Sequence, residues 1–297
     1  MTVAPATSSP QIAVSDYVLT LSCPDRPGIV SAVASFIADH ECNIVESQQF
    51  GDRASGTFFM RVQFEPVRGT RLNVDCLRGD FAGTAGHFGM AWRLLVAAEK
   101  QRVLILVSKF GHCLNDLLYR ANSGALNIDV PAVISNHPDL GMLADTYSVP
   151  FQHIPVTPET KADAERQLLS AIGELNIDLV VLARYMQILS SGLCQQLEGR
   201  AINIHHSMLP SFKGARPYQQ AHGRGVKVIG ATAHYVTPDL DEGPIIEQAV
   251  TRINHTMTAA QVTQLGRDNE CLALSRAVQW HTENRILLDG RRTVVFH

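Results

Sequence analysis

The sequence lacks the residue patterns that mark several common classes of protein. Its six cysteines include no pair separated by two or three residues, so it has no zinc-type cysteine pairing. Their spacing suggests no disulfide framework either, and we expect reduced thiols. A Gly-x-Ser-x-Gly elbow is missing, and no Walker loop or Gly-x-Gly-x-x-Gly fingerprint follows residues 102–108. These absences disfavour an elbow-type serine hydrolase and a glycine-built phosphate cradle.

The sequence also lacks a large excess of charge and any long apolar run. Lysine and arginine total 25 against 28 aspartates and glutamates, a formal net charge of −3, so no broad basic surface for nucleic acid is expected. Runs such as 178–183 fall far short of the roughly 18 residues that span a bilayer. The opening residues have neither a basic start nor a long apolar core. We therefore expect a cytoplasmic protein with no membrane partner and a disordered tail over 1–14.

Over residues 15–97, strand-like and helix-like segments follow one another in an order typical of a small sandwich domain. A half-buried strand, a helix with an apolar stripe, two strands around a turn, a second helix and a last strand follow one another. This β-α-β-β-α-β order predicts a ferredoxin-like fold. The expected strands cover 16–22, 42–50, 56–65 and 90–98, and the expected helices cover 28–40 and 70–86.

After an expected linker at 98–101, the pattern changes over residues 102–297. Short, nearly continuous apolar runs alternate with helical stretches, which is typical of strands buried on both faces of a parallel sheet. We predict a doubly wound, mostly parallel α/β domain of the Rossmann-like kind. Its expected strands cover 102–108, 130–135, 177–183 and 201–206, with more polar strands at 226–236 and 244–252 and helices at 161–175 and 258–285.

The polar residues of this second domain gather at predicted strand ends, where ligands bind in open parallel sheets. Asn203 and His205 share one face of a strand, and His206 then points to the other face. Adjacent histidines on a strand do not converge on one ion, so we expect no metal. His234 and Asp241 follow on the next strand and turn. From the residues alone, a packed histidine and a turn-forming aspartate remain open as explanations.

Two longer stretches resemble a known family. "INIHHSMLPSFKG" and "GATAHYVTPDLDEGPII" resemble the formyltransferase family that uses 10-formyltetrahydrofolate, over about residues 101–285. The resemblance implies a catalytic trio at Asn203, His205 and Asp241. "LARYMQIL" resembles the folate-pocket segment of that family. The implied folate-binding residues are Met186, Gln187, Ile188, Leu189, Val236, Thr237, Asp239 and Leu240.

The first domain resembles a second family. "LSCPDRPGIVSAVASFIADHECNI" resembles the first strand, loop and helix of an ACT domain. The resemblance implies a small amino acid as effector, bound near the residues Asp25, Arg26, Gly28, Asn43 and Ile44. The alternative is a domain that only dimerises. Pairing of such domains implies a homo-oligomer, either a dimer or a tetramer.

An ACT domain joined to a formyl domain resembles the deformylase family that hydrolyses 10-formyltetrahydrofolate to formate and tetrahydrofolate without a cofactor. "RYMQIL" and "HHS" are typical of it, and "SKFGHCLNDLL" replaces the glycine-rich loop of the transferases. Candidate residues on the acceptor side are Lys109, His112, His206 and His234. Two other interpretations remain open: a transferase that passes the formyl group to an amine, and a non-catalytic sensor that only binds folate.

Overall fold

The structure is a computed structural model that describes residues 16–67, 72–209 and 217–297. The tail expected at 1–14 lies outside the described residues, as does the 210–214 part of the "LPSFKG" motif. The chain forms two compact units, with the boundary between Glu99 and Lys100. Each unit is described by itself.

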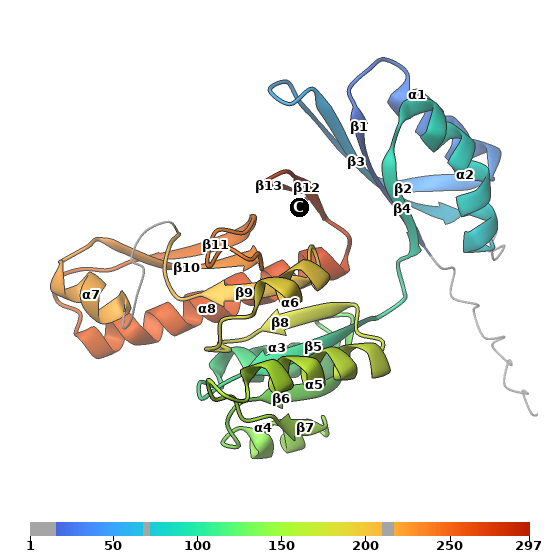
Figure 1. Ribbon diagram of the computed structural model, residues 1–297. Helices are drawn as coiled ribbons and strands as arrows, with labels where there is room; N and C mark the ends of the chain where they lie inside the picture. Colours follow the sequence, from blue (N-terminus) through green and yellow to red (C-terminus); the bar gives the residue numbers. More distant parts are fainter. Residues whose placement is uncertain (1–15, 68–71, 210–216) are drawn as a thin grey trace, which may run out of the picture. The chain divides into compact units, whose positions relative to one another are not determined.

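The first unit is a four-stranded antiparallel sheet with two helices (Figure 1). Its strand order is β2-β3-β1-β4, and the helices pack their apolar residues against the sheet to form one core. The prediction of a ferredoxin-like fold is confirmed. Its elements are β1 (Tyr17–Pro24), α1 (Ile29–Asp39), β2 (Cys42–Asp52), β3 (Thr57–Pro66), α2 (Val74–Phe88) and β4 (Ala91–Val96).

Both helices of this unit begin at residues suited to that position. Gly28 precedes α1 with a φ of 97°, a conformation that glycine adopts without steric cost. Asn73 caps α2, because its side chain accepts a hydrogen bond from the backbone of Asp75 at 2.8 Å. This cap places the start of α2 at Val74, later than the residue 70 expected from the sequence.

The second unit contains a seven-stranded sheet in the order β11-β10-β9-β8-β5-β6-β7. The strands from β9 to β7 are parallel, and β10 runs antiparallel to both of its neighbours. The mostly parallel, doubly wound prediction is confirmed. The strands are β5 (Gln101–Val107), β6 (Ile128–Ser135), β7 (Phe151–His153), β8 (Leu179–Leu182), β9 (Ala201–His205), β10 (Val228–Tyr235) and β11 (Ile245–Arg252).

Helices cover both faces of this sheet, which is why its central strands are apolar on both sides. Helices α3 and α8 pack on one face, and α5 and α6 pack on the other (Figure 1). The helices are α3 (His112–Ser123), α4 (Gly141–Thr146), α5 (Lys161–Glu174), α6 (Ser191–Gln196), α7 (Pro217–Gly223) and α8 (Ala259–Thr282). Among the described helices, none combines the length and apolar character that crossing a bilayer requires.

The last helix is shorter than predicted, because a hairpin follows it. Helix α8 ends at Thr282, and β12 (Ile286–Asp289) pairs with β13 (Arg292–Val295). The sequence has an Asp289-Gly290 turn signal here, and Gly290 has a φ of 58°. Such a dipeptide between apolar residues favours a tight hairpin, so the predicted extension of the helix to residue 285 was wrong.

The order of strands places a ligand site in this unit. The chain proceeds from β5 to β6 and β7 on one side, then crosses to β8 and β9 on the other side. The segments that leave the carboxyl ends of β5 and β8 therefore diverge, and open α/β sheets bind ligands in the crevice that results.

Candidate active site

A cleft of about 370 Å³ opens at the carboxyl ends of β8 and β9. Its lining includes the segment that follows β8 and the loop between β10 and β11. The polar residues of the expected trio all line this cleft. The lining residues are Leu182, Arg184, Tyr185, Met186, Gln187, Ile188, Leu189, Cys194, Asn203, Ile204, His205, His206, His234, Val236, Thr237, Pro238, Leu240 and Asp241.

Asn203 and His234 face each other across the neighbouring strands β9 and β10, where they are register partners. Nδ1 of His234 lies 2.9 Å from the carbonyl oxygen of Tyr235. A carbonyl only accepts, so Nδ1 donates. Burial lowers the pKa of His234, so the ring is neutral and its Nε2 accepts. The amide Nδ2 of Asn203 donates to that Nε2 at 3.2 Å. The second hydrogen of Nδ2 is thereby held in a fixed direction.

His205 and Asp241 form the second pair of the cleft. Nδ1 of His205 lies 3.2 Å from Oδ1 of Asp241, and the two side chains are 8% and 14% exposed. Burial by itself would raise the pKa of Asp241, but the hydrogen bond from His205 and the electrostatic interaction with that imidazole lower it overall. Nε2 of His205 is buried and has no hydrogen-bond partner among the described residues. Buried polar atoms without partners are rare, and a site that awaits a ligand or water is one explanation for them.

The loop that carries Asp241 has a tightly constrained backbone. Asp241 itself has a φ of 59°, in the left-handed region that aspartate, asparagine and glycine enter most easily. A Cβ atom built on Gly243 would lie 1.8 Å from the carbonyl oxygen of Tyr235, so only glycine fits there. The nitrogen of Tyr235 donates to the carbonyl of Pro244 at 2.9 Å. Together these features hold the carboxylate of Asp241 in the cleft.

The walls of the cleft expose much apolar surface. Met186, Ile188 and Leu240 are 54%, 60% and 58% exposed, and all three line the cleft. The backbone nitrogen of Met186 donates to Oγ of Ser108 at 2.9 Å, which fixes the segment to the end of β5. Exposed apolar side chains from these two segments suit the faces of a flat ring system.

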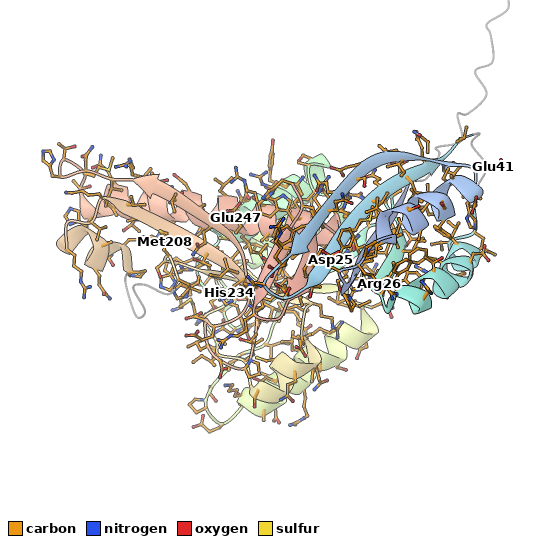
Figure 2. The ribbon with its side chains drawn as sticks, turned by 90° about the horizontal axis from the view of Figure 1, so that it is seen from above. Asp25, Arg26, Glu41, Met208, His234 and Glu247 are labelled. Atoms are coloured by element: carbon orange, nitrogen blue, oxygen red, sulfur yellow. The ribbon has the colours of Figure 1, made fainter. Side chains whose placement is uncertain are left out.

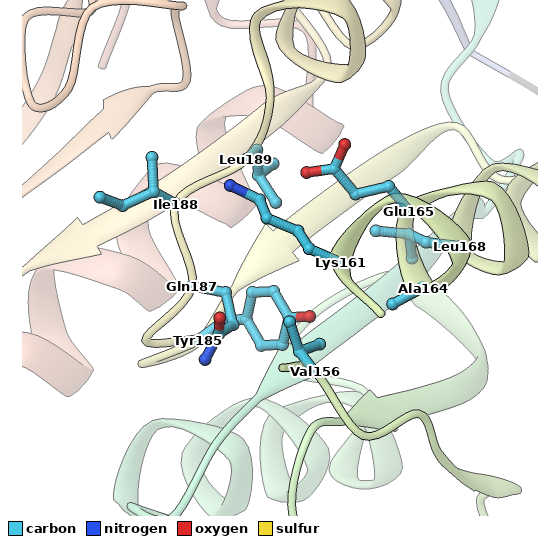
Figure 3. Close-up of a pocket in the computed structure, with 9 residues that line it drawn as sticks. All are labelled: Val156, Lys161, Ala164, Glu165, Leu168, Tyr185, Gln187, Ile188 and Leu189. Carbon is cyan, nitrogen blue, oxygen red and sulfur yellow. The ribbon is translucent and has the colours of Figure 1, made fainter. Parts of the chain in front are cut away.

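A second hollow lies between α5 and the 185–189 segment (Figure 3). It holds about 10 Å³, which is room for roughly one water molecule. Glu165 of α5 accepts a hydrogen bond from the nitrogen of Ser190 at 2.8 Å. Burial, with the nearby charge of Glu165, raises the pKa of Tyr185 to about 12. Gln187 lines both hollows. This region therefore supports the wall of the cleft from behind.

Comparison with known proteins agrees with this architecture. Residues 101–278 match the formyl transferase family, and residues 17–73 match the ACT domain. A formyltetrahydrofolate deformylase from Corynebacterium sp. strain P-1 is 52% identical over 94% of this chain and 97% of its own. The crystal structure of a formyltetrahydrofolate deformylase from Burkholderia mallei has a TM-score of 0.91 at 49% identity, covering 95% of this chain and 100% of that one. The chain belongs to the formyltetrahydrofolate deformylase family.

A transferase is similar over a smaller part of the chain. Glycinamide ribonucleotide transformylase 1 from Symbiobacterium toebii has a TM-score of 0.63 at 28% identity and covers 69% of this chain and 98% of its own. The relatives from the deformylase family match nearly the whole chain, ACT domain included.

The structure corrects the prediction that His206 points to the opposite face of the strand from His205. Strand β9 ends at His205, so the alternation of side chains does not extend one residue further. The rings of His205 and His206 stack with centroids 5.2 Å apart and planes 29° apart, and both line the cleft. Burial, followed by the charges of Arg184 and His205, lowers the pKa of His206 to about 4. His206 is therefore neutral at neutral pH.

Three other expected residues are not among those lining the cleft. Asp239 is exposed, and its carbonyl accepts from Oγ1 of Thr237 at 3.0 Å, so it shapes the turn. Lys109 is exposed. His112 begins α3 and pairs through Nε2 with Oε2 of Glu270 at 2.8 Å.

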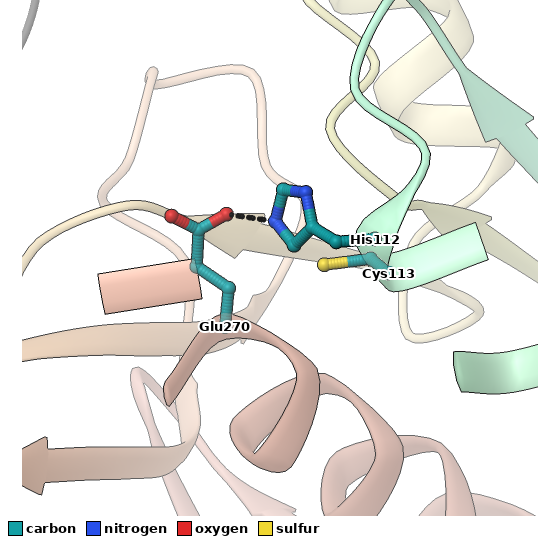
Figure 4. A group of neighbouring side chains, drawn as sticks. All are labelled: His112, Cys113 and Glu270. Carbon is teal, nitrogen blue, oxygen red and sulfur yellow. Dashed lines mark hydrogen bonds and ion pairs between the residues drawn. The ribbon is translucent and has the colours of Figure 1, made fainter. Parts of the chain in front are cut away.

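Sequence reasoning missed two residues of this region, Glu270 and Arg184 (Figure 4 shows Glu270 with His112). The side chain of Glu270 is 1% exposed. It pairs with His112, with Arg184 at 3.1 Å and with the hydroxyl of Tyr218 at 2.7 Å. One signal could have found it: Glu270 lies on the apolar stripe of α8, four residues after the buried Gly266, and charges are rarely buried without partners.

Among the described residues, the side chains of His112, Cys113 and Glu270 place potential metal-ligand atoms within 4.8 Å of one another. However, Oε2 of Glu270 already pairs with both His112 and the guanidinium of Arg184. A fixed positive charge beside the same oxygen opposes a cation there. The cluster is therefore explained as a buried ion-pair network.

The expected regulatory residues lie at two ends of the first sheet. Asp25 and Arg26 are neighbours at the turn after β1 (Figure 2), and the guanidinium of Arg26 lies 4.6 Å from the ring centre of Phe88. Asn43 and Ile44, on β2, pair with the opposite end of β3. The register separates the two groups by most of the length of β2, so within one chain they do not form a single site.

Proposed function

We propose that this chain hydrolyses 10-formyltetrahydrofolate to formate and tetrahydrofolate. The observation that carries the proposal is the convergence of Asn203, His205 and Asp241 at one end of an apolar cleft. The relatives named formyltetrahydrofolate deformylase support the same reaction. The exposed apolar walls of the cleft would hold the pteridine, and the reaction needs no cofactor.

In the first step, water attacks the formyl carbon. Nδ1–H of His205 donates to Asp241, so in the neutral ring Nε2 carries the lone pair and takes a proton from the water as the new C–O bond forms. The negative charge that develops on the formyl oxygen is stabilised by the second Nδ2–H of Asn203. That hydrogen is already oriented by the bond to His234, so little reorganisation is needed.

In the second step, the bond between the formyl carbon and N10 breaks. The imidazolium of His205 gives its proton to N10, and tetrahydrofolate and formic acid are released, the acid ionising to formate. Asp241 balances the positive charge of the imidazolium between the two steps. The proton that reaches N10 is the one taken from the attacking water.

The deciding experiment is a chromatographic assay of formate and tetrahydrofolate with the purified protein and no acceptor added. Hydrolysis predicts that the two products appear in equal amounts. A transferase would release little formate and would pass the formyl group to an added amine, and a sensor would bind folate without turnover. Either result would contradict the proposal.

We further propose that the ACT domain makes the enzyme a homo-oligomer in the cytoplasm and that a small amino acid regulates it. Because Asp25 and Asn43 lie at opposite ends of the sheet, an effector that touched both groups would have to bind between two copies. The test is the formate assay with and without small amino acids, combined with the molar mass from light scattering. A monomer that still responds to an amino acid would refute the shared site.

A further inference from the structure

Arg184 is held in place more firmly than a surface arginine. It follows β8 with a φ of 65°, a backbone conformation that is strained for a residue with a side chain. Its side chain is only 10% exposed. One terminal nitrogen of the guanidinium donates to Glu270 at 3.1 Å, and the group lies 5.4 Å from the ring centre of Phe110. Strain of this kind persists where the surroundings determine the conformation.

Glu270, which anchors Arg184, is itself held by other elements. It pairs with His112, at the start of α3, and with Tyr218 of α7. Burial by itself would raise the pKa of Glu270, but the hydrogen bond from His112 and the charge of Arg184 lower it overall. The carboxylate is therefore ionised, and residues from two other helices, α3 and α7, hold Glu270 of α8 in position.

Arg184 lines the cleft, and Glu270 is not among the lining residues. Of the two residues of the ion pair, therefore, Arg184 borders the cleft, with its side chain 10% exposed, and Glu270 is buried, with its side chain 1% exposed. A second guanidinium, that of Arg267, lies 5.6 Å from the ring centre of Phe110. The charge of Arg184 also contributes to the low pKa of His206, a lining residue, so its field extends into the cleft.

We propose that Arg184 is a specificity-determining residue. Its guanidinium, positioned by Glu270, excludes cationic amines from the position of the attacking nucleophile, so that water reaches the formyl carbon in preference to them. This inference deepens the proposed hydrolase and rests on it. An amine acceptor would form a C–N bond to the formyl carbon while the N10–C bond breaks, and its proton would pass to N10. Aliphatic amines arrive mainly as ammonium ions, which a fixed positive charge repels. Water carries no charge and is not repelled.

The experiment measures how the formyl group is partitioned between water and an added amine. The purified full-length protein receives 10-formyltetrahydrofolate with glycinamide, which is largely cationic at neutral pH, or with hydroxylamine, which is largely neutral. Formate and the formylated amine are quantified by mass spectrometry. In the unaltered protein, hydroxylamine should compete with water better than glycinamide does, after correction for their rates with the free substrate. Equal competition by the two amines would overturn the inference without any variant.

Three variants sharpen the test. Arg184→Met removes the charge but keeps an unbranched side chain, and it should raise the ratio of formylglycinamide to formate about tenfold, the order expected for one partly screened charge. Arg184→Lys keeps the charge and should preserve the exclusion. Glu270→Gln frees the guanidinium from its anchor and should give a smaller rise. Circular dichroism reports whether each variant is folded.

The control is Arg166→Met on α5, where the arginine is 70% exposed and pairs with Asp163 three residues away. Its partition ratio should equal that of the unaltered protein. If Arg184→Met and Glu270→Gln turn over substrate with an unchanged ratio, the inference is wrong while the hydrolase stands. If the unaltered protein releases no formate, the proposed function itself has failed. If Arg184→Met does not fold, Glu270→Gln and the comparison of the two amines decide the matter.

Discussion

Replacing Asp241 by asparagine should reduce formate release about 10³-fold while leaving folate binding almost unchanged. Asparagine has the same shape and tolerates the φ of 59° found here, so the loop keeps its conformation. What is lost is the charge that balances the imidazolium of His205, whose Nδ1 lies 3.2 Å from Oδ1. Two unit charges about 4 Å apart interact by about 4 kcal/mol at an effective dielectric constant of about 20, which is roughly three powers of ten in rate.

The assay for this variant is single-turnover formate release, with the dissociation constant of a non-hydrolysable folate measured in parallel. Asp239→Asn is a matched control, because Asp239 is on the same loop but is exposed and outside the cleft lining. The control should keep nearly full activity. A fall of less than about tenfold in Asp241→Asn, with folate binding intact, would show that the carboxylate does not support the imidazolium.

Three further predictions concern the walls of the cleft. Gly243→Ala should distort the loop that carries Asp241, since its Cβ would meet the carbonyl oxygen of Tyr235 at 1.8 Å. Limited proteolysis and formate release are the measurements, and an active, protease-resistant variant would contradict this prediction. Asn203→Ala should lower kcat by about 10²–10³-fold, as loss of an oxyanion donor does, with KM little changed; a lower melting temperature with kcat intact would instead indicate a structural role. His206 has a pKa of about 4 in the folded chain against about 6.5 unfolded. Below pH 6.5 the unfolded chain binds the extra proton, so the free energy of unfolding should fall as the pH drops towards about 4, by at most about 3 kcal/mol before solvent screening. Urea titrations of His206→Gln should show a weaker fall, and an unchanged pH dependence would refute the assignment.

The fold could be predicted largely because its strands carry an unambiguous pattern. Runs such as 102–108 and 177–183 are almost entirely apolar, and a sheet covered on both faces buries them. The ends of helices and strands were harder to predict, since they depend on caps and turns. Because Asn73 caps α2, this helix begins later in the sequence than predicted. The Asp289-Gly290 hairpin lies directly after the residues that the periodicity had assigned to helix α8.

The site was predictable only in part, for physical reasons. Asn203 and His205 share a face because strand alternation fixes it, whereas His206 does not follow, because alternation stops where the strand stops. Glu270 could not be connected to Arg184 by any local spacing. Helix α8 brings the two together only when the sheet and its helices are assembled, and that long-range contact is invisible to a pattern followed along the chain.

The backbone of the loop that carries Asp241 has a genetic consequence. A left-handed residue at position 241 accepts aspartate, asparagine or glycine with the least strain, and a single nucleotide change converts an aspartate codon into either of the other two. By the proposed mechanism, such a mutation leaves the pocket intact and nearly abolishes turnover, so the mutant protein would sequester folate instead of hydrolysing it.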